Sequence, residues 1–146
     1  MGLVRKLFIG LVVLILLMGV IGFLLPASGH VEREIVIDAP AQTVFDVVRD
    51  FDQFNAWSPW HGLDPDARYE QSGTRGEVGS RFAWYSEKPE VGNGTQTITA
   101  LNANSLVAMD LTFEGQSPAT SEFRMSPEGS GTRVVWTLDT NFGANP

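Results

Sequence analysis

The chain opens with a long apolar run that stands apart from the patterned sequence after it. Residues 7–25 hold no charged side chain and are almost entirely aliphatic, with a few glycines. At about 1.5 Å per residue, a helix of this length reaches about 28 Å, close to the roughly 30 Å hydrocarbon core of a bilayer. The run therefore predicts a transmembrane helix between a short cytoplasmic segment (1–6) and a linker (26–30).

The charges beside the apolar run predict its orientation. Arg5 and Lys6 precede the run, whereas residues 26–31 carry no Lys or Arg. The positive-inside rule places such an N-terminus in the cytoplasm and the rest of the chain outside it, tethered to the lipid bilayer. A cleaved secretory signal peptide is the alternative, with residues 27–29 (ASG) as its cleavage site. We favour the single-pass anchor, because signal peptides usually have only about 7–15 apolar residues.

Beyond the linker the apolar positions first alternate and then change to helical spacing. Residues 30–38 alternate as a strand does, although Arg33 falls among the apolar positions. A short helix is predicted after Pro40, because apolar residues recur there at helical spacing: Val44, Phe45, Val48 and Phe51. A second short helix is predicted over residues 50–56 and ends before Pro59.

From residue 67 onward the period changes to two, which is typical of strands. The connections are short and rich in Gly, Asn and Pro, which favours antiparallel hairpins. We therefore predict an α+β fold with two short helices and an antiparallel sheet of about seven strands. The later strands are predicted at 67–71, 81–85, 95–101, 107–113, 119–125 and 134–138.

Two stretches give this order of elements a family resemblance. Residues 35–45 (IVIDAPAQTVF) and residues 55–60 (NAWSPW) resemble segments of the START-like, or SRPBCC, polyketide cyclase/dehydrase superfamily. The second stretch resembles a membrane-tethered subgroup whose function is largely undefined. The resemblance covers residues 31–146. It implies a helix-grip domain, in which a curved antiparallel sheet grips a long C-terminal helix and a hydrophobic cavity lies between them.

The end of the chain departs from that family pattern. Residues 141–146 (NFGANP) are turn-like, and no helical sequence follows the last predicted strand. We therefore expect a fragment that is incomplete at its C-terminus. If the sequence is complete, the uncovered apolar sheet face predicts self-association, because such a patch exceeds what monomers usually expose.

Large apolar side chains supply the candidate ligand cavity that the resemblance implies. Packing in the core is the competing interpretation for most of them. Trp57 and Trp60 flank Ser58 and Pro59 on a predicted loop, where they either rim a cavity entrance or cap the helix pair. The candidate cavity residues are Trp57, Trp60, Phe82, Trp84, Met109, Leu111, Phe113, Phe123 and Trp136.

The sequence offers few groups for catalysis or metal binding. It contains no cysteine and only two histidines, and we expect no cofactor and no resident metal. Residues 61–66 (HGLDPD) hold a histidine and two aspartates, but a solvated loop is the simpler interpretation. Arg33 shares its strand face with Ile35 and Ile37, and it needs a carboxylate partner from a ligand or a glutamate unless its tip reaches solvent.

Charge and pattern together favour a binding module. Apart from Arg5 and Lys6, the chain has 8 basic and 17 acidic residues, a net charge of −9, which argues against a nucleic-acid partner. We therefore expect a membrane-tethered domain that binds a small hydrophobic or amphipathic molecule. The alternatives are a cyclase or dehydrase-type enzyme, for which no acid–base pair is evident, and an envelope interaction protein whose partner the sequence does not specify.

Overall fold

The computed structural model describes residues 28–141. The predicted anchor at 7–25, and any helix after the last strand, lie outside these residues. Within them, no helix is long and apolar enough to cross a membrane. The elements follow one another as β1 (Ser28–Ile37), α2 (Ala41–Val48), α3 (Phe51–Trp57), α4 (Pro59–Leu63), β2 (Arg68–Ser72), β3 (Arg81–Tyr85), β4 (Gly94–Asn102), β5 (Leu106–Phe113), β6 (Ala119–Glu128) and β7 (Gly131–Asn141).

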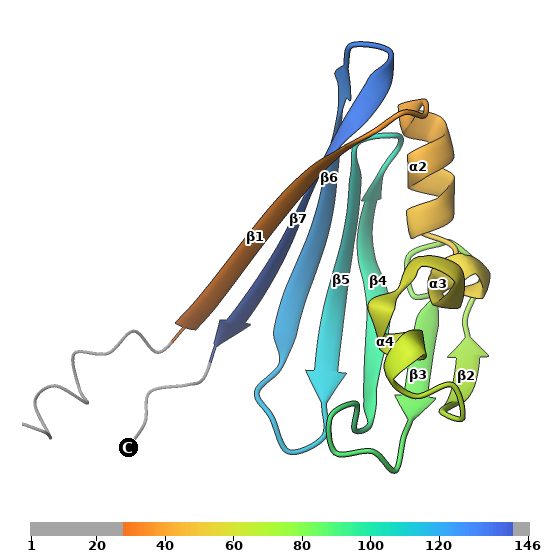
Figure 1. Cartoon of the computed structure of the whole chain (residues 1–146), viewed down its shortest axis with the longest axis vertical. Helices are drawn as coiled ribbons and strands as arrows, with labels where there is room; N and C mark the ends of the chain where they lie inside the picture. Colours follow the sequence, from red (N-terminus) through yellow and green to blue (C-terminus); the bar gives the residue numbers. More distant parts are fainter. Residues whose placement is uncertain (1–27, 142–146) are drawn as a thin grey trace, which may run out of the picture.

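All seven strands form one antiparallel sheet with the order β1-β7-β6-β5-β4-β3-β2 (Figure 1). Strands β2 to β7 follow one another as a meander. Strand β1 forms one edge of the sheet and pairs with β7, from Ser28 opposite Asn141 to Ile37 opposite Thr132. Helix α2 packs across β5, β6 and β7. The predicted α+β class and antiparallel sheet of seven strands are therefore confirmed.

The helical region differs from the prediction, because it contains three short helices instead of two. The additional helix, α4, begins at Pro59, directly after the C-terminus of α3. The Ser58 hydroxyl accepts a hydrogen bond from the Trp60 amide at 3.3 Å, and proline at the first helical position needs no amide partner. Trp57 and Trp60 consequently lie on helices and not on the predicted loop.

The buried apolar side chains of the central strands belong to the same core as the buried side chains of α2 and α3. Phe82 and Ile98 are each only 1% exposed, and Val107 is fully buried. Phe51 and Phe54 of α3 lie with their ring centroids 5.6 and 5.2 Å from the ring of Phe82. The aromatic stripe of α3 therefore closes the core over β3 and its neighbours.

A polar clamp holds the loop between β2 and β3 against the start of α3. Arg75 donates two hydrogen bonds to the Asp50 carboxylate, at 2.8 and 2.5 Å, and contacts Asp52 at 2.8 Å. These bonds lower the pKa of Asp50 to about 2. Gly73 shapes the same loop, since it has a φ of +81° and a Cβ there would lie 2.6 Å from the Gly79 carbonyl oxygen.

Candidate ligand-binding site

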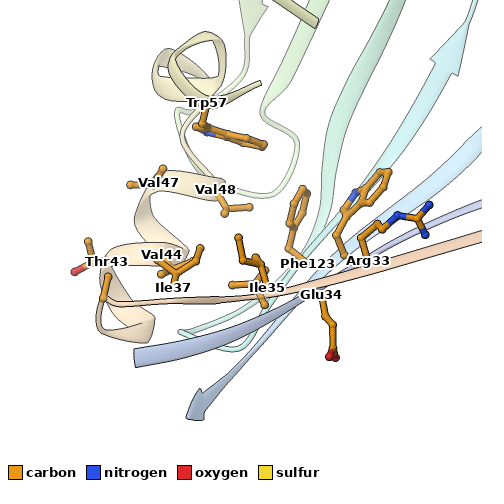
Figure 2. Close-up of a pocket in the computed structure, with 13 residues that line it drawn as sticks. Arg33, Glu34, Ile35, Ile37, Thr43, Val44, Val47, Val48, Trp57 and Phe123 are labelled. Atoms are coloured by element: carbon orange, nitrogen blue, oxygen red, sulfur yellow. The ribbon is translucent and has the colours of Figure 1, made fainter. Parts of the chain in front are cut away.

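An open cavity of about 410 Å³ lies between α2 and the β1 side of the sheet. In Figure 2, α2 borders it on the left, Trp57 lies above it, Ile35 and Ile37 lie below it, and Phe123 borders it on the right. Its volume is within the roughly 300–1,000 Å³ typical of small-molecule sites. The further apolar residues that line it are Ala39, Val44, Val47, Val48, Val134 and Trp136.

The cavity exists because α2 covers only part of the face that β1 adds to the sheet. Val44 and Val48 are buried, and they anchor α2 to the core. Ile35 stands opposite Val134 in the β1–β7 register, yet its side chain is 61% exposed. An apolar wall therefore stands beside the helix with no described side chain packed over it.

Only three polar residues reach the cavity, namely Arg33, Glu34 and Thr43. Figure 2 shows Glu34 pointing away from it, and the Glu34 carboxylate pairs with Arg133 at 2.8 Å. Arg33 extends beyond Phe123, at the end of the cavity farthest from Thr43. The site is therefore apolar, with one charged group at one end.

Three of the nine predicted cavity residues line this space: Trp57, Phe123 and Trp136. They form a connected aromatic group, since the ring centroid of Phe123 lies 6.0 Å from that of Trp57 and 6.5 Å from that of Trp136. The Trp136 indole donates its N–H to the Ser121 hydroxyl at 2.8 Å, which fixes the ring against β6. Residues far apart in the sequence are thus brought together, because Trp57 at the end of α3 contacts Phe123 of β6, which pairs with Trp136 of β7.

The other six predicted residues lie elsewhere. Phe82 and Met109 are fully packed in the core, and Trp84 and Leu111 are half-buried against it. Phe113 makes an edge-to-face contact with Trp84, with ring centroids 5.7 Å apart. Trp60 is 54% exposed on α4.

Sequence reasoning missed the aliphatic half of the site. Val47 lies on α2, and Ile35 and Val134 lie on the paired β1 and β7 strands. Ile35 and Val134 lie on predicted strand faces, whereas Val47 is not part of the predicted helical stripe of α2. The exposure of Ile35 follows from tertiary packing, so the periodicity of β1 did not reveal it.

The polar segment at 61–66 forms structural contacts. Asp64 accepts a hydrogen bond from the Ser86 hydroxyl at 2.5 Å and lies 3.5 Å from the Lys88 ammonium. The His61 ring instead faces the Tyr69 hydroxyl at 3.2 Å. These contacts join α4 to β2 and to the loop after β3, and no three His, Asp or Glu residues in the described part of the chain form a metal site.

The fold and its apolar concavity define a START-like, helix-grip domain. A model of the family described as polyketide cyclase/dehydrase and lipid transport matches residues 28–146. The chain belongs to this family, as the resemblance of its sequence motifs predicted. A search of curated proteins by sequence finds no match.

Solved structures share the fold at low sequence identity. CalU16 from Micromonospora echinospora is 23% identical with a TM-score of 0.54, and the match covers 78% of this chain and 60% of that one. Protein CV1439 from Chromobacterium violaceum is 14% identical with a TM-score of 0.60, covering 80% and 83%. Ginseng major latex-like protein 151 from Panax ginseng is 15% identical with a TM-score of 0.57, covering 79% and 80%.

Proposed function

We propose that this protein is a membrane-tethered binding domain that holds a small hydrophobic or amphipathic molecule in the cavity between α2 and β1. The observation that carries the proposal is the solvent-open apolar wall around Ile35, beside the aromatic group of Trp57, Phe123 and Trp136. Filling such a space with an apolar chain gains about 25 cal/mol for each Å² removed from water. The family description, which includes lipid transport, supports the same class of ligand.

The tether is the second part of the proposal. The apolar run at 7–25 and its basic flank support an anchor with the domain outside the cytoplasm. Few residues separate this run from Ser28, where β1 begins, so the tether keeps the domain close to the lipid. Proximity to the bilayer gives the cavity access to membrane-soluble molecules.

Photoaffinity labelling tests the ligand proposal. The full chain, in lipid nanodiscs, is exposed to a long-chain alcohol that carries a diazirine, and labelled peptides are mapped by mass spectrometry. We expect saturable labelling of peptides from β1 and α2. Val47→Trp places an indole in the cavity and is expected to reduce this labelling at least about fivefold.

Val78→Trp is the matched control, because it adds the same side chain at an exposed position that does not line the cavity. This variant is expected to label as the wild type does. Equal labelling of the two tryptophan variants, or labelling that never saturates, contradicts the binding proposal.

The tether is tested separately by extraction of cell membranes with alkaline carbonate. We expect the full chain to stay in the membrane pellet and a variant that lacks residues 1–27 to be released. Intact mass measurement of the protein in the pellet and in the released fraction distinguishes the anchor from the signal peptide. A mass that shows loss of the apolar run overturns the tether and leaves the ligand proposal standing.

A further inference from the structure

We propose that Arg33 selects anionic amphiphiles, so that the ligand carries a carboxylate at one end of its apolar chain. The inference rests on the proposed function, because it assigns the head group of the molecule in the same cavity. Its basis is the position and the pairing of one side chain.

Arg33 is brought to the cavity by the register of the edge strand. It stands opposite Trp136 in the β1–β7 pairing, two positions from Ile35 on the same face of β1. The cavity lining therefore runs from aliphatic side chains at α2 to an indole and a guanidinium at the other end (Figure 2). An extended ligand with its chain against α2 would bring its head group to Arg33.

Most N–H donors of the Arg33 guanidinium have no hydrogen-bond partner among residues 28–141. One nitrogen, Nη1, donates to the carbonyl oxygen of the neighbouring Glu32 at 2.8 Å, and Arg33 forms no ion pair with a carboxylate of residues 28–141. The other charged residue at the cavity, Glu34, is paired with Arg133. Arg33 is therefore the only unpaired charge among the residues that line the cavity.

This lack of a partner is unusual within the described chain. Arg81 is the only other arginine there without an ion pair, whereas the rest contact Asp or Glu: Arg49, Arg68, Arg75, Arg124 and Arg133. Arg81 lies on the opposite sheet face from Phe82 and is solvent-exposed. Of the two unpaired arginines within residues 28–141, Arg33 lines the apolar cavity and Arg81 does not.

A carboxylate is the head group that this arrangement fits. The planar guanidinium can donate two parallel hydrogen bonds to a carboxylate, and such charge-assisted bonds are stronger than neutral ones. A neutral alcohol of the same chain length would fill the apolar lining without using the charge. An ammonium head group would meet repulsion at Arg33.

The test compares a diazirine-bearing fatty acid with the matching alcohol on the full chain in nanodiscs, at a pH where the acid is ionised. In Arg33→Gln we expect the concentration of fatty acid that half-saturates labelling of the cavity to rise about tenfold. Labelling by the alcohol is expected to stay unchanged. Arg33→Lys, which keeps the charge, is expected to recover part of the affinity for the acid.

Arg81→Gln is the matched control, since it removes the other unpaired arginine and is expected to change neither labelling curve. Equal effects of Arg33→Gln and Arg81→Gln on the fatty acid overturn the assignment of Arg33, as does an equal effect of Arg33→Gln on acid and alcohol. In each of those cases saturable labelling by the alcohol leaves the binding function intact. Failure of both compounds to label the cavity overturns the proposed function and this inference together.

Discussion

The helix-facing side of the sheet has two regions with the same alternation of apolar residues, but their apolar side chains are buried to different extents. In β3 and β4, Phe82 and Ile98 are each 1% exposed, and the Phe82 ring packs against Phe51 and Phe54 of α3. On β1, Ile35 occupies an equivalent inward position but is 61% exposed beside the cavity. We call these the closed region and the open region. The difference shows that covering helices, and not strand pattern, decide whether such a face becomes a core or a site.

The largest expected difference between the two regions is in stability. Phe82→Ala removes a ring packed against Phe51, Phe54 and Tyr69, and we expect it to lower the free energy of unfolding by about 3–5 kcal/mol. Ile35→Ala in the open region is expected to cost less than about 1 kcal/mol, because its side chain is already 61% exposed. Pulse proteolysis in urea measures both, and equal losses would remove the distinction between the regions.

The closed region is also expected to lose stability in acid through Asp50. Its pKa is lowered to about 2 by hydrogen bonds from Arg75, and its side chain is 11% exposed. Because the pKa of Asp50 is lower in the folded protein than in the unfolded chain, its carboxylate stabilises the fold at pH values above 3.8. This stabilisation is lost as the pH falls towards 2. Because Arg75 is 63% exposed, solvent screening reduces the contribution to about 1 kcal/mol.

Unfolding measured between pH 5 and pH 2 on wild type and Asp50→Asn tests this contribution. The wild type is expected to lose its advantage over the variant across that range. A difference between the two proteins that is independent of pH would show that the carboxylate charge does not stabilise the clamp.

The smallest expected effect concerns the edge of the open region, where His30 of β1 bonds to Asp139 of β7 at 2.6 Å. This contact raises the pKa of His30 above 6.5. The pair therefore stabilises the fold below pH 6.5, and this stabilisation is lost as the pH rises through the raised pKa of His30. An NMR titration is expected to show the His30 pKa falling in Asp139→Asn. An unchanged pKa in that variant would mean that the pair does not hold this end of β1.

The sequence predicted the sheet well, because alternation in β5 and β6 directly reports which side chains face inward. It predicted helix α2 from the spacing of Val44 and Val48. It predicted α3 and its end before Pro59 but did not predict α4, although Ser58 followed by Pro59 is a helix-start signal. Residues 57–60 are predicted as a loop, because a helix of five residues such as α4 is too short to show a helical apolar spacing.

The candidate site was harder to predict, because its position depends on which inward residues the helices leave uncovered. Phe82 and Phe123 have the same kind of strand environment in the sequence. In the fold, Phe82 lies under α3 and Phe123 borders the cavity. Aromatic content therefore identified candidates of both kinds, and only the packing of α2 and β1 separates them.

Hydrogen exchange with and without a bound amphiphile tests the central comparison most directly. The full chain in nanodiscs is measured alone and with saturating fatty acid, and exchange rates are compared for α2 and β1 against β2 and β3. We predict slower exchange in α2 and β1, with β2 and β3 unchanged. Equal slowing in both regions, or no slowing in α2 and β1, would contradict the account of an open region that serves as the ligand site.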